Sequence, residues 1–157
     1  MNAPNPNLIR WVLSSLCNHF NQYKGTYSLY IEGMLRRTGA LQKYAELRID
    51  GPNFYLVQKG LWHISCEVNI LITSQASDAN LYTYSTMCGH FASSFYDTIS
   101  VLKYGSEVGD DQSYVGCLKL KYSKDEKLEV HHFGIIDPAT NLQQGSIEGH
   151  YIMEFQE

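Results

Sequence analysis

The clearest pattern in the chain is an alternation of apolar and polar positions between residues 62 and 73. Six apolar residues stand at every second position: Trp62, Ile64, Cys66, Val68, Ile70 and Ile72. A period of two is typical of a strand with one buried face, because successive side chains point to opposite faces of a sheet. The pattern therefore predicts a long strand whose apolar face needs a covering layer.

Near the N-terminus, apolar residues recur three and four positions apart, which is the spacing of one helix face. They are Ile9, Val12, Leu13, Leu16 and Phe20. Asn5 is a suitable N-cap and Pro6 suits the first turn, and we expect the helix to end at or before Gly25. The sequence predicts an amphipathic helix here.

The same spacing predicts a second helix over residues 81–102, ended by Gly105 in left-handed geometry. Its apolar stripe comprises Leu81, Tyr84, Cys88, Phe91, Phe95, Thr98 and Leu102. We expect this stripe to cover the apolar face of the strand at residues 62–73, since neither surface is stable in water.

Shorter alternating or apolar runs predict the remaining strands, which are residues 26–31, 45–50, 54–58, 114–122, 128–133 and 146–155. Gly51-Pro52 is expected to break the second run from the third, and residues 123–126 are typical of a hairpin turn. The element order predicts a single α+β domain over residues 1–157, a mostly antiparallel sheet packed by two helices.

Charge narrows the possible partners. The chain has 12 Lys and Arg against 16 Asp and Glu, a net charge of −4, and Arg36-Arg37 is its longest basic cluster. Proteins that bind nucleic acids or anionic membranes usually carry a basic face, so neither partner is expected. The longest aliphatic run, residues 70–72, is too short to cross a bilayer, and the first residues do not resemble a signal peptide.

The cysteines and histidines indicate no metal centre. Cys17, Cys66, Cys88 and Cys117 form no close pair, which favours reduced core thiols in a cytosolic chain. His131-His132 would point to opposite faces of a strand and cannot share one ion, although His63 or His150 could join one of them. We favour one core-facing and one exposed imidazole.

The sequence also indicates no enzyme and no cofactor. Gly109-Asp110-Asp111 is similar to the metal-binding turn of some polymerases, but the further carboxylates that such enzymes need have no counterpart here. The nucleophile elbow, the phosphate-binding glycine loops and the metalloprotease helix motif are missing from the sequence.

Two stretches carry a resemblance to a known family. Residues 46–52, Glu-Leu-Arg-Ile-Asp-Gly-Pro, lead through Gly60-Leu61-Trp62 into the long strand. Residues 133–138, Phe-Gly-Ile-Ile-Asp-Pro, turn into residues 147–151, Ile-Glu-Gly-His-Tyr. With the element order over most of the chain, they resemble the tail-terminator and neck-completion proteins of tailed bacteriophages.

The resemblance implies a structural virion protein, assembled in the host cytoplasm and without catalytic residues. Its subunits would form a ring, usually hexameric, between the tail tube protein and the head connector, with DNA passing through the lumen. Weak attraction for phosphates, as expected from the acidic charge, would suit that passage.

Six charged residues are the candidates for contacts in such an assembly: Arg36, Arg37, Lys43, Glu107, Asp110 and Asp111. The first three belong to residues 32–43, and we expect neighbouring subunits to meet through this segment and through strand edges. The others belong to the loop 106–113, which would face the channel or the next ring, or would be a plain solvent-exposed connector. The competing function is a small ligand-binding α+β domain with an apolar cavity, and a hydrolase with an unrecognised site is a third class.

Overall fold

Three long antiparallel strands form the centre of the sheet: β2 (Lys43–Gln58), β3 (Leu61–Gln75) and β7 (Leu142–Gln156). The computed structural model describes residues 4–31, 43–75, 80–103, 113–121, 128–137, 139 and 141–157. In these residues the even-numbered positions of β3 from 62 to 72 are all buried, which confirms the predicted alternation.

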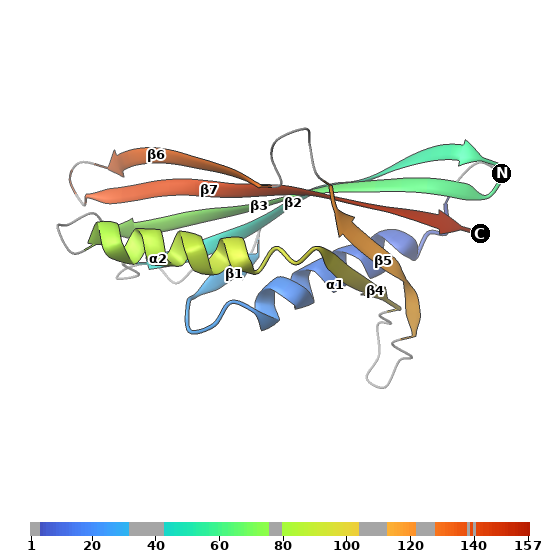
Figure 1. Cartoon of the computed structure of the whole chain (residues 1–157), viewed down its shortest axis with the longest axis horizontal. Helices are drawn as coiled ribbons and strands as arrows, with labels where there is room; N and C mark the ends of the chain where they lie inside the picture. The colour runs from blue at the N-terminus through green and yellow to red at the C-terminus, as the bar shows by residue number, and fades with distance from the viewer. Residues whose placement is uncertain are drawn as a thin grey trace.

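The described chain is an α+β fold with two helices and a mostly antiparallel, strongly curled sheet of seven strands that resembles a half-barrel. Both helices lie along the same face of the sheet (Figure 1). This confirms the predicted class and the predicted antiparallel sheet. The short strand β1 (Leu29–Ile31) pairs with β2 in parallel and is the exception.

One edge of β7 is shared by two strands. The first half of β7 pairs with β6 (Glu129–Asp137). Residues just past the middle of β7 pair with the end of β5 (Tyr114–Leu120). The other edge of β5 pairs with β4 (Thr98–Leu102). The predicted hairpin between residues 114–122 and 128–133 is therefore wrong. Because β7 is 15 residues long, its edge accommodates both strands one after the other.

The first helix, α1 (Leu8–Gln22), buries Val12, Leu16 and Phe20 of the predicted stripe. Ile9 was also expected on this face but is 45% exposed, because Leu8 and Trp11 occupy the buried side of the first turn. Its N-cap position is Asn7, two residues later than expected. Asn5 instead accepts a hydrogen bond from the backbone N–H of Asn7 at 2.9 Å, which forms the turn before the helix.

The second helix, α2 (Asn80–Ser93), is shorter than predicted. Residues 98–102 form β4, in which Ile99 and Val101 are buried and Thr98 and Ser100 are exposed. The β-branched residues in this stretch favour a strand, and pairing with β5 supplies its backbone hydrogen bonds. The spacing that suggested one long helix therefore spans a helix, a turn and a strand.

The core lies between the helices and the curled sheet. As predicted, Phe91 and Phe95 are buried there, although Phe95 follows α2 and does not belong to it. Two glycines on the core face of β7 allow the close approach of rings from the other layer. A Cβ atom added at Gly149 would lie 2.9 Å from the ring of Phe95, and one added at Gly145 would collide with Tyr84.

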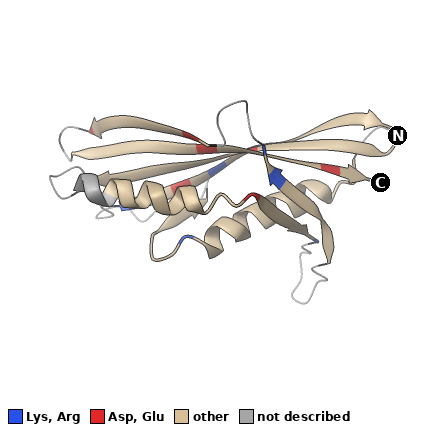
Figure 2. Ribbon diagram, in the orientation of Figure 1, with Lys and Arg blue, Asp and Glu red and all other residues tan. Residues whose placement is uncertain are grey.

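The face of the sheet away from the helices carries most of the polar residues of the strands. Figure 2 shows acidic and basic positions dispersed along the described strands. Gly51 and Pro52 lie at a bulge within β2 and do not end the strand, in contrast to the prediction. No helix in the described ranges is long and apolar enough to cross a membrane.

Candidate functional site

A polar row crosses four strands on the outer face of the sheet. Arg48 of β2 lies opposite Asn69 of β3, Asn69 lies opposite Glu148 of β7, and Glu148 lies opposite Glu129 of β6. Residues in register share a face, because the pleats of neighbouring strands are aligned. The fold thus aligns four charged or amide side chains from distant parts of the sequence.

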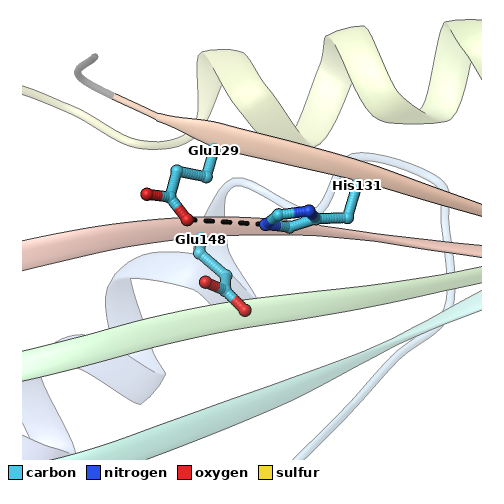
Figure 3. Close-up of side chains that lie close together, drawn as sticks. All are labelled: Glu129, His131 and Glu148. Atoms are coloured by element: carbon cyan, nitrogen blue, oxygen red, sulfur yellow. Dashed lines mark ion pairs between the residues drawn. The ribbon is translucent and has the colours of Figure 1, made fainter. Parts of the chain in front are cut away.

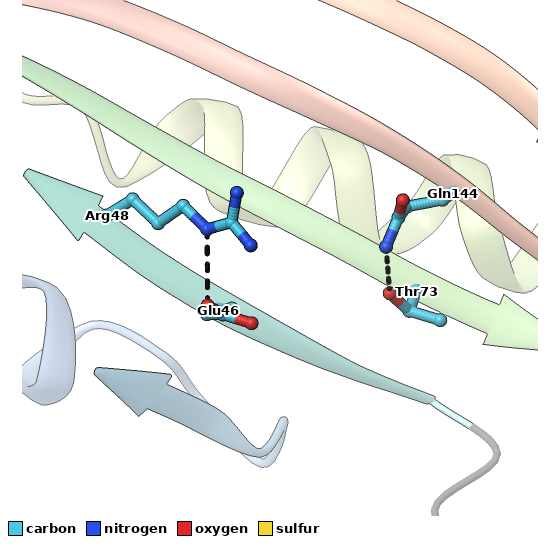
Figure 4. A network of polar contacts seen from close by, with 4 residues as sticks. All are labelled: Glu46, Arg48, Thr73 and Gln144. Atoms are coloured by element: carbon cyan, nitrogen blue, oxygen red, sulfur yellow. Dashed lines mark hydrogen bonds and ion pairs between the residues drawn. The ribbon is translucent and has the colours of Figure 1, made fainter. Parts of the chain in front are cut away.

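Specific contacts hold this row. The Asn69 amide donates from Nδ2 to Glu148 Oε1 at 2.8 Å. Arg48 Nε donates to Glu46 Oε1 of the same strand at 3.2 Å (Figure 4). Farther along β3 and β7, Gln144 Nε2 of β7 donates to Thr73 Oγ1 of β3 at 3.2 Å. Because Glu46 is almost fully buried, its ion pair with Arg48 compensates a charge that water cannot solvate.

His131 joins the row at its β6 end. Its Nε2 lies 3.4 Å from Glu129 Oε2, and Glu148 approaches from β7 (Figure 3). One ligand atom from each of these three residues lies within 4.8 Å of the other two. Two carboxylates and an imidazole are donors that divalent transition metals accept.

The predicted separation of the two histidines is confirmed in part. His131 is on the outer face, whereas the ring of His132 contacts Tyr84 of α2, with 5.0 Å between ring centroids. Both imidazoles are exposed, so neither is a core residue. Neither His63 nor His150 belongs to the group of metal-ligating atoms at His131.

Two exposed apolar strand segments lie at opposite ends of the sheet. We call residues 129–137 the β6 edge and residues 53–58 the β2 end. The large apolar side chains on them are 44–61% exposed: Val130, Phe133, Ile135 and Ile136 on the β6 edge, and Tyr55, Leu56 and Val57 on the β2 end. In Figure 1, the β6 edge lies at one end of the sheet and the β2–β3 turn at the other.

Each of these segments has a strand partner on one side only among the described residues. The β6 edge pairs with β7, and the β2 end pairs with β3, since β1 reaches only residues 45–47 of β2. In the order of strands, β2 and β6 flank β3 and β7 on opposite sides. The sequence predicted strands over residues 54–58 and 128–133, but it did not identify their apolar side chains as exposed, because alternation does not say which part of a sheet lacks a neighbouring strand.

Most of the charged residues proposed from sequence lie outside the described residues, namely Arg36, Arg37, Glu107, Asp110 and Asp111, as do residues 32–42 and 104–112 around them. Lys43 is the described one. It begins β2, it is exposed, and its ammonium lies 5.6 Å from the centroid of the Tyr27 ring. This distance is within the range of a cation–π contact inside the chain.

Two hollows lie among the described residues. One of about 360 Å³ is lined by Arg48, Ile49, Asp50, Glu67 and Asn69, beside the polar row. The other, of about 460 Å³, lies between β3, β5 and β7 and is lined by residues that include His63, Tyr114, Cys117 and Met153. Between the helices and the sheet, the described residues include fully buried side chains such as Phe20, Met87 and Tyr151.

The four cysteines are free thiols, of which Cys66 is buried, whereas Cys17, Cys88 and Cys117 are half-buried. Burial, with a smaller effect of the Asp50 charge, raises the pKa of Cys66 to about 12, and burial also raises the pKa of Cys17 and Cys88. A nucleophilic cysteine needs a lowered pKa, so these three thiols are suited to packing.

No protein-family model matches the chain, and no curated protein matches its sequence.

Proposed function

We propose that the chain is the subunit of a homo-oligomeric ring in the neck of a tailed bacteriophage. It would act there as a structural protein that joins the tail tube to the head connector. The observation that carries this proposal is the pair of exposed apolar strand segments, the β6 edge and the β2 end, on opposite sides and ends of one sheet.

Exposed strand edges bind other strands, because their backbone N–H and C=O groups lack partners. Here the two segments are different patches of one subunit, so a contact between them would be head-to-tail. Head-to-tail contacts between identical subunits form closed rings when the rotation closes. A two-fold dimer would instead join a patch to itself.

The charge of the chain supports a role around passing DNA. A net charge of −4 gives little attraction for phosphates, so DNA could pass without being held. Residues 32–43 and the acidic loop 106–113 remain candidates for contacts with neighbouring subunits or with the adjoining neck proteins. The filled core gives less support to a ligand-binding domain with an apolar cavity.

Lysine substitutions on the two segments test this proposal, because lysine on an edge strand opposes strand addition. Ile135→Lys alters the β6 edge and Val57→Lys alters the β2 end, and both sites are more than half exposed. We expect each variant alone to lose the self-association of the parent chain in light-scattering measurements. Ile9→Lys, on the exposed side of α1, is the matched control and should associate like the parent.

Mixing the two variants gives the sharpest result. Each variant keeps one intact segment, so a head-to-tail contact predicts that an equimolar mixture forms one-to-one heterodimers and nothing larger. A mixture that stays monomeric, or variants that associate like the parent, would contradict the proposed contact.

A further inference from the structure

We propose that Glu129, His131 and Glu148 form a zinc site on the outer face of the sheet. This proposal does not depend on the ring. Glu129 and His131 are two positions apart on β6 and therefore share a face, and Glu148 lies opposite Glu129 on β7. The three side chains come together at the beginning of β6, where it joins the central sheet (Figure 3).

The spacing of the ligand atoms suits one zinc ion. Zinc binds imidazole nitrogen and carboxylate oxygen at about 2.0–2.2 Å, so two ligands of a tetrahedral ion are about 3.4 Å apart. His131 Nε2 and Glu129 Oε2 are 3.4 Å apart, whereas direct N–H···O hydrogen bonds are usually near 2.9 Å. The ligand atom of Glu148 lies within 4.8 Å of the other two. The Glu129 and His131 side chains are about half exposed, at 50% and 48%, which leaves them room to rotate toward it.

Charge also favours a divalent cation here. Like charges directly opposite each other on neighbouring strands are destabilising, and Glu129 and Glu148 are such a pair. With a neutral imidazole as the third ligand, the site carries two negative charges. A zinc ion would balance both charges and remove the repulsion.

One carboxylate of the site is already positioned by a neighbour. Asn69 holds Glu148 Oε1 through a hydrogen bond of 2.8 Å, which leaves the second oxygen of Glu148 available. Metal-binding carboxylates are commonly oriented in this way by side chains that do not touch the metal. Three protein ligands leave a fourth position for water, and the bound ion would link the edge strand β6 to β7.

Isothermal titration calorimetry of the untagged full chain with zinc tests the site. We expect one zinc ion per chain for the parent. His131→Ala and Glu148→Gln should bind zinc roughly tenfold more weakly or worse, since each loses a ligand. His132→Ala is the matched control, because it removes the adjacent imidazole from the other face and should keep the parent's affinity.

Circular dichroism of the metal-free variants checks that they fold. If His131→Ala does not fold, Glu129→Gln takes its place, and cobalt(II) is used as a coloured substitute for zinc. The parent with tetrahedral cobalt(II) should show intense visible absorption bands, and Glu129→Gln should lack them. A parent chain that binds no zinc would overturn the proposal. The proposal would also be overturned if His131→Ala or Glu129→Gln bound zinc as tightly as the parent. It would be overturned as well if His132→Ala lost as much zinc affinity as His131→Ala.

Discussion

Replacing Phe91 by alanine tests how α2 is held on the sheet. The Phe91 side chain is 1% exposed, and its ring lies 5.8 Å from that of Tyr27, measured between centroids. Burial of a phenylalanine contributes about 1.5–3 kcal/mol, and the cavity left by truncation raises the expected loss to about 3–5 kcal/mol. For a chain of this length that loss lowers the melting temperature by about 6–20 °C.

The assay is urea unfolding followed by far-ultraviolet circular dichroism, in which the midpoint should fall while its slope stays unchanged. Phe133→Ala is the matched control, because this phenylalanine on the β6 edge is 56% exposed. Its truncation should cost about 0.7–1.5 kcal/mol, since about half of the burial is absent to begin with. Equal losses for Phe91→Ala and Phe133→Ala would refute the packing described for α2.

Three further predictions concern packing and ionisation. Gly149→Ala should lower the unfolding free energy by about 1–3 kcal/mol in the same urea assay, because the new methyl group meets the Phe95 ring at 2.9 Å. Gly89→Ala, in α2 with open space around it, should instead raise it by up to about 1 kcal/mol. Burial lowers the pKa of His19 despite a hydrogen bond to a backbone carbonyl, so the unfolded chain binds its proton first as the pH falls. Stability should therefore decline below about pH 6.5, and His19→Gln should reduce that decline in parallel melting curves. Cys66, with its pKa raised to about 12, should react with iodoacetamide at pH 8 only after urea unfolding, and rapid labelling of the folded chain, read by mass spectrometry, would contradict its burial.

The local periodicity of the sequence was enough to predict the elements with one buried face. The alternation from Trp62 to Ile72 identified β3 and its core face, because burial of one face leaves a period of two in the residues themselves. The same reasoning failed after Ser93. Phe91, Phe95 and Thr98 fit a helical spacing, but pairing with β5 makes the last of them part of a strand.

The candidate sites depend on register, which the sequence does not show. His131 was recognised as a possible ligand, but its neighbours Glu129 and Glu148 meet only because β6 pairs with β7 in one particular alignment. The exposed apolar segments were hidden for a similar reason. The sequence predicted a strand only as far as Phe133, whereas β6 continues to Asp137 and pairs with β7 alone, which leaves Ile135 exposed.

Electron cryomicroscopy of the concentrated full chain tests the ring most directly, because it shows both the number of subunits and the surfaces that join them. We predict a closed ring, with a mass of about six times the 17.9 kDa of the chain if it is hexameric. In that ring the β6 edge of each subunit meets the β2 end of the next. A closed two-fold dimer, or a chain that stays monomeric at roughly millimolar concentration, where even weak contacts form, would contradict it.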